Sequence, residues 1–60
     1  MNAPTPDQIK QARAQAGLTA KEAAKIVHVY ERAWQRWEAG DRAMQAGLWE
    51  LFCMKTGCKP

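Results

Sequence analysis

The feature that most constrains this chain is residues 18–40, which read LTAKEAAKIVHVYERAWQRWEAG. Small, apolar and turn-forming residues recur there at spacings that predict two short helices joined by a tight turn. Ala24 falls where the helices would cross, and its small side chain allows the roughly 8–10 Å separation of close helix packing. Both helices must face one core, and the positions that would do so are all apolar: Ala23, Val27, Val29, Trp34 and Trp37.

This stretch, and above all its ending WQRWEAG, resembles the helix-turn-helix of the lambda-repressor and Cro-like DNA-binding family. The resemblance covers residues 9–42. It implies an all-α fold, a four- to five-helix lambda-repressor-like domain whose recognition helix enters duplex DNA.

Three positions depart from the family pattern. His28 stands where the family commonly has Gly and the turn needs a positive φ, which His adopts more often than most residues. Ala20 replaces a Gln that commonly contacts DNA. Ala23 replaces a large aliphatic residue while Trp34 is larger than usual, so we expect the volume lost on one helix to be regained on the other.

The length of 60 residues predicts a single domain over residues 1–60 with a small core. Such a chain buries only about 60% of its unfolded surface, so we expect dimerisation to support it and expect neither an enzyme nor a cofactor. The net charge of +3 permits nucleic-acid binding without requiring it. No apolar run is long enough for a membrane span and no secretory signal is evident, so we expect a cytoplasmic protein.

The 2 cysteines predict neither a metal site nor a disulfide framework. Cys53 and Cys58 have the spacing of no zinc motif, and the one histidine, His28, is distant in sequence. In the cytoplasm both thiols would be reduced by default, and whether either forms a disulfide stays open. His28 has no nucleophile placed to work with it, which favours a turn residue over a general base.

A first helix is predicted from Thr5 as N-cap, Pro6 in the first turn and Gln8 as capping-box partner, with Gly17 at its end. Residues 1–4 have nothing to pack with and are expected to be a frayed leader. The buried stripe of this helix would be Ile9, Ala12 and Ala16.

Arg13, beside this stripe, has two interpretations. A surface arginine is most often a solvated charge. The family resemblance instead implies an ion pair with Glu38 that ties the first helix to the end of the third, and we favour this pair.

Thr19 and Glu22 predict a capping box at the start of the second helix. Lys21 lies on the outer side of that helix, where it either contributes a solubilising charge or contacts a DNA phosphate, and the sequence does not decide between the two. The family pattern turns Ile26 outward, while Leu18 is expected to fill the core.

The third helix, residues 30–39, has two unlike faces at about 100° per residue. Trp34 and Trp37 share one side, where core packing is a better interpretation than stacking on single-stranded bases. The other side is rich in groups that read base edges, since Arg bonds guanine, Gln bonds adenine and Glu accepts from cytosine. These residues are Arg32, Gln35 and Arg36, with Glu31 at the edge.

The like charges of Arg32 and Arg36, one turn apart, disfavour an isolated helix slightly unless an anion offsets them. We therefore favour a DNA-binding face over a merely solvated one. The resemblance implies base contacts by Glu31, Arg32 and Arg36 and a backbone contact by Arg42. Tyr30 would lie at the N-cap, reaching a phosphate or sugar or else covering the edge of the core.

A last helix is predicted over residues 44–56, ending at Gly57. Its apolar residues cover nearly the whole circumference, more than one core-facing stripe can use. In relatives of the family the C-terminal helices often pair across a two-fold axis. We therefore expect Trp49 and Cys53 to form a homodimer contact, and the core-facing residues to be Leu48, Leu51 and Phe52.

The sequence thus favours a sequence-specific DNA-binding transcriptional regulator of bacterial or phage type, most simply a repressor that binds a palindromic operator in duplex DNA as a homodimer. No small-molecule effector domain is evident. The alternative is an antitoxin or protein-interaction module whose last helix binds another chain. The operator, the regulated gene and the choice between repression and activation cannot be read from these residues.

Overall fold

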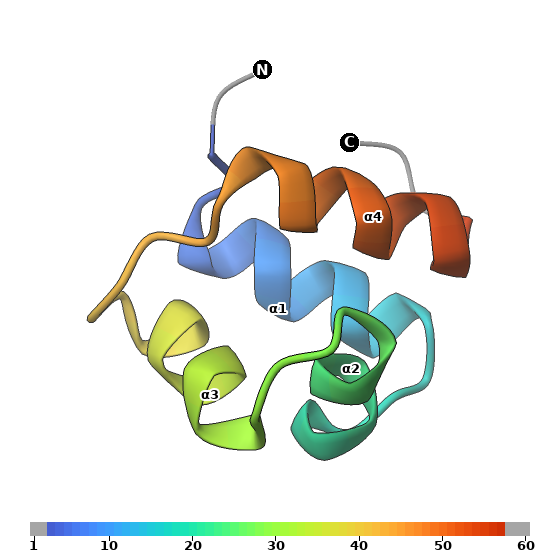
Figure 1. Ribbon diagram of the computed structural model, residues 1–60, viewed down its shortest axis with the longest axis horizontal. Coiled ribbons are helices and arrows are strands. Elements are labelled where there is room, and N and C mark those ends of the chain that lie inside the picture. Colours follow the sequence, from blue (N-terminus) through green and yellow to red (C-terminus); the bar gives the residue numbers. More distant parts are fainter. Residues whose placement is uncertain (1–2, 58–60) are drawn as a thin grey trace.

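The computed structural model describes residues 3–57, and these form an all-α fold, as predicted (Figure 1). The described part of the chain holds four helices, the lower of the two expected numbers. None of them is of a length and apolar character that would let it span a lipid bilayer. The helices are α1 (Pro6–Gln15), α2 (Ala20–Ile26), α3 (Glu31–Ala39) and α4 (Ala46–Thr56).

The helices enclose one core that is centred on Trp34. α2 and α1 both pack against α3, and α4 packs against α2. The fully buried Trp34 ring lies 5.6 Å from Trp37 and 4.9 Å from Phe52 between ring centroids. Trp49 stacks on Phe52 at 6.4 Å. Such aromatic pairs each add about 0.5–1.5 kcal/mol beyond their buried area.

The expected inward positions of α2 and α3 are confirmed. Ala23 and Ala24 are fully buried, so their small side chains lie where α2 meets the rest of the core. Val27 and Trp37 are buried, and Val29 packs half-buried against the core. A small Ala23 and a large Trp34 share this core, as the predicted exchange of volume requires.

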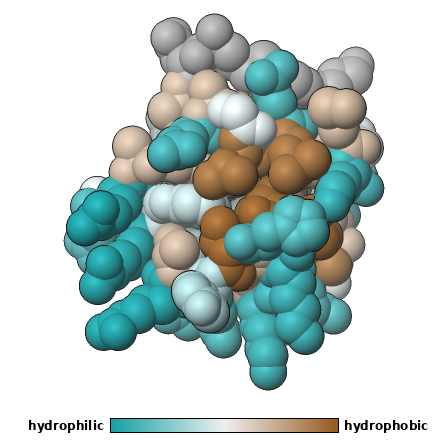
Figure 2. Space-filling model, viewed as in Figure 1, coloured by the Kyte–Doolittle hydropathy of each residue, from teal (hydrophilic) through white to brown (hydrophobic). Residues whose placement is uncertain are grey.

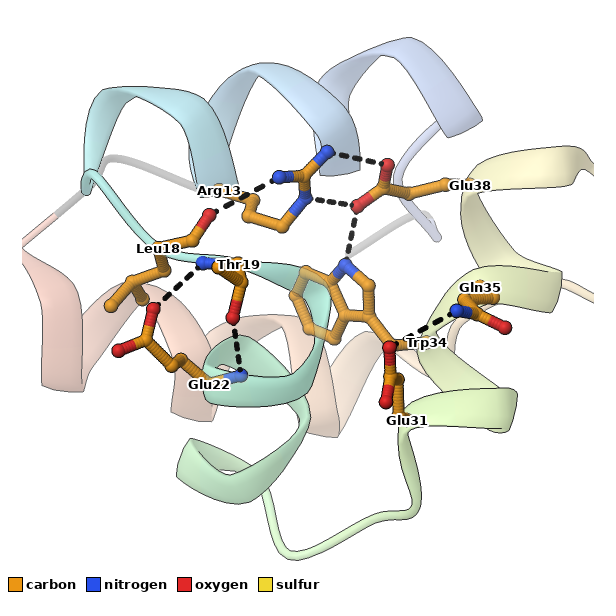
Figure 3. A network of polar contacts seen from close by, with 8 residues as sticks. All are labelled: Arg13, Leu18, Thr19, Glu22, Glu31, Trp34, Gln35 and Glu38. Carbon is orange, nitrogen blue, oxygen red and sulfur yellow. Dashed lines mark hydrogen bonds and ion pairs between the residues drawn. The ribbon is translucent and has the colours of Figure 1, made fainter.

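A polar network joins α1 to α3 (Figure 3). Arg13 Nε donates to Glu38 Oε2 at 2.6 Å and Arg13 Nη2 donates to Glu38 Oε1 at 3.0 Å. Arg13 Nη1 also donates to the backbone oxygen of Leu18 at 3.1 Å. Trp34 Nε1 donates to the same Glu38 Oε2. The predicted ion pair is therefore confirmed, and it also gives the indole N–H a partner that a buried donor needs.

This network favours the charged form of Glu38. The hydrogen bond from Arg13 is the largest influence and lowers the pKa of Glu38; partial burial opposes it, and the Trp34 N–H lowers the pKa further. The same bond to Glu38 raises the pKa of Arg13.

Helix ends follow the sequence signals closely. Thr5 Oγ1 accepts from the Gln8 backbone N–H at 3.2 Å, while Gln8 Oε1 accepts from the Thr5 N–H at 2.8 Å. Thr19 and Glu22 make the same reciprocal pair at 3.2 and 2.9 Å. Both predicted capping boxes are thus present. Gly17 follows the C-cap of α1 with a φ of 71°, as predicted for the end of this helix.

The predicted frayed leader is wrong at Pro4, which is buried; residues 1–2 lie outside the described residues. Pro4 directly precedes the N-cap Thr5, and Ile9 is the fourth residue of α1. Pro4 and Ile9 therefore occupy the two positions of a hydrophobic staple. Ile9 is also buried. An apolar residue directly before an N-cap therefore belongs to the core here.

Two other predictions fail where a helix is shorter than expected. Ala16 is exposed, because α1 ends at Gln15 and the stripe stops with Ala12. Met44 lies before α4, whose N-cap is Gln45, yet it is fully buried. Met44 thus fills the core from the α3–α4 connection.

The predicted rotation of α4 is also wrong. Trp49 and Cys53 are only 6% and 3% exposed within one chain, so they pack in its core and cannot form the expected dimer contact. Phe52 is buried as predicted. Leu48 and Leu51, expected inside, are half-buried. The stripe at 49, 52 and 53 faces inward because its two aromatic rings fill the space around Trp34.

An apolar area consequently remains on the surface. Figure 2 shows hydrophobic residues gathered in the middle of the visible face, over α4 and the region between α4 and α2. We define the apolar face as the half-buried residues Ile26, Val29, Leu48 and Leu51. At its edge, Lys55 Nζ of α4 donates to the Ile26 backbone oxygen of α2 at 3.2 Å.

We expect Arg13→Met to lower the free energy of unfolding by about 1–3 kcal/mol, since the part-buried Glu38 carboxylate and the Leu18 backbone oxygen lose their guanidinium partner. The Arg13 and Glu38 side chains are 22% and 16% exposed, so solvent screening reduces the expected loss of stability. Thermal unfolding followed by circular dichroism measures it. Arg42→Met, at an exposed arginine, is the matched control. Equal melting temperatures for the two variants would contradict the role of the pair.

We also expect acid to remove the stabilisation that Glu38 provides. Its pKa is lowered from an ordinary value of 4.5, so the stabilisation is complete above that pH and is lost as pH falls through the folded-state pKa. Urea titrations between about pH 6 and 3 should show a smaller loss of stability in Glu38→Gln than in the wild type. Glu50→Gln, at an exposed position on α4, should keep the wild-type dependence.

Candidate nucleic-acid interface

The turn between α2 and α3 sets the direction of the exposed helix. His28 has a φ of 61°, the positive value predicted for this position. Its N–H donates to the Lys25 oxygen at 3.2 Å, and the Val29 N–H donates to the Ala24 oxygen at 3.0 Å. These bonds close the end of α2, so the chain reverses within a few residues and α3 starts at Glu31.

The two faces of α3 are divided as the helical period predicts. Trp34 and Trp37 point inward and are buried, whereas Arg32, Gln35 and Arg36 are exposed. The tryptophans and the Glu38 contact fix the rotation of α3 about its axis. The base-reading side chains are thereby held on the outside.

Three arginines converge at one flank of α3. An open groove of about 690 Å³ is lined by Arg32, Arg36 and Arg42 together with Tyr30, and Ala33 and Trp37 also line it. Arg42 comes from the turn after Gly40, whose φ of 82° redirects the chain there. Arg42, the predicted backbone contact, and Arg32 and Arg36, two of the predicted base contacts, therefore lie around a common groove.

This groove is strongly cationic. Within residues 3–57 there is one ion pair, between Arg13 and Glu38. In the same part of the chain, no carboxylate lies within 4 Å of the Arg32, Arg36 or Arg42 guanidinium groups. Three cations without a paired anion repel one another, and a polyanion placed against them relieves that repulsion.

Tyr30 is the N-cap of α3 and is 88% exposed. Its side chain makes no capping hydrogen bond, so the phenol is available at the mouth of the groove. The Tyr30 side chain is therefore exposed and does not cover the edge of the core.

Gln35 lies in a second, shallower groove of about 260 Å³ between Arg32 and Arg36, with Ala39 and Asp41. Gln35 Nε2 donates to Glu31 Oε2 at 3.1 Å (Figure 3). Glu31 is exposed but lines neither groove. It lies at the edge of the base-reading face, as predicted.

Thr19 and Lys21 are not brought into these grooves. Thr19 is the N-cap of α2, where its hydroxyl oxygen accepts the Glu22 N–H. Lys21 is exposed in the first turn of the same helix. Any contact they make with DNA is separate from the α3 groove.

The sequence reasoning missed the apolar floor of the larger groove. Ala33 and Trp37 line it; Trp37 was predicted only as a core residue, and no role was predicted for Ala33. At 100° per residue they lie on the flank between the core side and the exposed side, which is the signal that could have identified them.

No group of three or more His, Cys, Asp and Glu side chains within residues 3–57 could hold a metal ion. Cys53 is buried beside Phe52 on α4, and Cys58 lies outside the described residues.

Comparison with known proteins identifies the family. Residues 7–60 match the family described as helix-turn-helix domain. The chain is also 38% identical over 47 residues to the Type II methyltransferase M.MspI of Moraxella sp.. That match covers 78% of this chain but only 11% of the methyltransferase, so the likeness concerns a small part of that protein. With the paired helices, the positive-φ turn and the outward face of α3, the chain belongs to the helix-turn-helix domain family, a fold that binds DNA.

Proposed function

We propose that the chain is a sequence-specific DNA-binding transcriptional regulator that inserts α3 into the major groove of duplex DNA. The observation that carries the proposal is a set of exposed guanidinium groups on and just after a helix anchored by two buried tryptophans. Arg32, Arg36 and Arg42 have no carboxylate partner among residues 3–57, and Gln35 lies on the same helix. Arg and Gln are the side chains that best distinguish guanine and adenine at their major-groove edges.

The contacts divide into two kinds. Arg32, Gln35 and Arg36 would contact base edges and select sequence. Thr19, Lys21, Tyr30 and Arg42 would contact the sugar–phosphate backbone, provide salt-dependent affinity and set the register. The apolar lining at Ala33 and Trp37 suits the hydrocarbon face of a deoxyribose, with Arg42 at the adjacent phosphate.

A homodimer on a palindromic operator completes the proposal. Since Trp49 and Cys53 are in the core, the two protomers would contact one another through the apolar face. The dimer would then bind half-sites about 10 bp apart. Met54, 81% exposed on α4, extends the apolar surface of that helix. A bound dimer would act in the cytoplasm as a repressor by occluding the operator, and we assign no catalysis to this chain.

A second candidate rests on the match to a methyltransferase. The segment could act within, or bind to, a larger protein through the same apolar face, using α3 to place that protein on DNA. The two candidates share the DNA contacts and differ in what covers α4.

Selection of bound sites from random duplex DNA tests the DNA-binding proposal. We expect one motif with two half-sites. Arg36→Ala should weaken binding to it by about 1–3 kcal/mol and relax preference at one base pair. Lys21→Ala should weaken binding to all sequences alike and reduce the dependence on salt by about one charge.

Lys10→Ala on α1 is a control of equal charge, exposed and outside both grooves. Recovery of no enriched motif, or equal base preferences in Arg36→Ala and the wild type, would contradict the proposal.

Sedimentation equilibrium tests the dimer. We expect a concentration-dependent dimer that Leu51→Glu abolishes, because a buried carboxylate without a partner disfavours association. Gln11→Glu, which adds the same charge at an exposed position of α1, should leave the dimer intact. A wild-type chain that stays monomeric at micromolar concentration, with and without DNA, would remove the homodimer and favour the second candidate.

A further inference from the structure

The hydrogen bond between Gln35 and Glu31 constrains how the amide of Gln35 can be presented to DNA. The two residues are one turn apart on the exposed side of α3, and the donor is Gln35 Nε2 at 3.1 Å from Glu31 Oε2. Figure 3 shows the two side chains lying toward one another. Among the base-reading residues within 3–57, Gln35 is the one with a side-chain hydrogen bond; Arg32 and Arg36 have none.

This bond selects one orientation of the amide. A glutamine amide has two N–H donors and one oxygen acceptor. The flipped amide would place its oxygen against the Glu31 carboxylate, two acceptors facing one another without a proton between them. Glu31 therefore keeps the nitrogen of Gln35 on its own side.

The groups that remain for a ligand match one base. With one N–H donated to Glu31, Gln35 retains one N–H and its oxygen. Adenine presents one acceptor, N7, and one donor, N6–H, in the major groove, whereas guanine presents two acceptors. The oriented amide can therefore pair doubly with adenine and not with guanine.

The position of Glu31 indicates that it acts through Gln35. Gln35 lies in the shallow groove between Arg32 and Arg36, while Glu31 lines neither groove of the interface. A carboxylate is also repelled by DNA phosphates when it approaches the duplex itself.

We propose that Glu31 is a positioning residue that orients Gln35 to read adenine, and not a base-contacting residue. This inference rests on the proposed DNA-binding function. It replaces the base contact that the family resemblance implied for Glu31. Holding the Gln35 side chain in its bound orientation removes part of the entropy cost of binding adenine. Loss of Glu31 should therefore reduce the preference for adenine at this position.

Glu31 also has an ordinary structural role that the test must separate. It supplies the acidic charge in the first turn of α3, whose N-cap Tyr30 provides no side-chain hydrogen bond. Glu31→Gln loses that charge but keeps an oxygen acceptor for Gln35. Glu31→Ala loses both, so the two variants differ in positioning alone.

The experiment compares duplexes that carry each of the four base pairs at the position where Gln35→Ala loses its preference. We expect Glu31→Ala to reduce the preference for adenine there by about two- to tenfold. Glu31→Gln should keep most of the preference, and Glu50→Ala, the same charge change on α4, should keep all of it. In a Gln35→Ala background, Glu31→Ala should have no further effect on base preference.

Nuclear magnetic resonance of the protein without DNA gives a second readout. The side-chain amide protons of Gln35 should lose the chemical-shift signature of hydrogen bonding in Glu31→Ala and keep it in Glu31→Gln. This result does not depend on any DNA sequence.

Three outcomes would overturn the inference. They are an unchanged adenine preference in Glu31→Ala, an effect of Glu31→Ala at a different base pair that persists without Gln35, and Gln35 amide signals that do not respond to Glu31. If the wild type prefers no sequence at all, the proposed function fails as well, and that result is distinct from the other three.

Discussion

The carboxylate of Glu38 makes the contact on which the rest of this structure depends. It binds the guanidinium of Arg13 through both oxygens and accepts the indole N–H of Trp34. A fully buried indole donor without a partner would cost about 1–3 kcal/mol, a large share of the stability of a domain this small. One side chain near the end of α3 thus makes a tryptophan acceptable at the centre of the core.

The same contact determines which side of α3 faces solvent. Trp34 packs inward on Phe52 and Trp37, and Glu38 ties the last turn of α3 to α1. A helix held at these points cannot rotate about its axis. Arg32 and Arg36, on the opposite side, are then exposed whatever their own interactions are.

Two kinds of arginine follow from this arrangement. Arg13 is satisfied by Glu38 and the Leu18 oxygen and holds the fold together. Arg32, Arg36 and Arg42 have no carboxylate within 4 Å in the described part of the chain and surround a groove with an apolar floor. Local sequence does not separate the two kinds, since each is an arginine on or after an amphipathic helix. Their partners across the fold separate them.

The sequence by itself determined the local structure. Thr5 and Thr19 with their partners at the third helical position, and the inward tryptophans of α3, follow from short-range rules, because capping and helical period involve residues within a few positions of each other. The positive φ of His28 was implied by family resemblance. The Arg13–Glu38 pair came from family resemblance and not from spacing.

Tertiary structure alone decided the rotation of α4, the burial of Pro4 and Met44, and the convergence of Arg42 with α3. An almost wholly apolar helix carries no pattern that distinguishes one stripe from another, so the space around Trp34 selected Trp49, Phe52 and Cys53. Packing chooses the stripe whose shape fills the core, and shape is a property of residues that are distant in the sequence and meet only when the chain has folded.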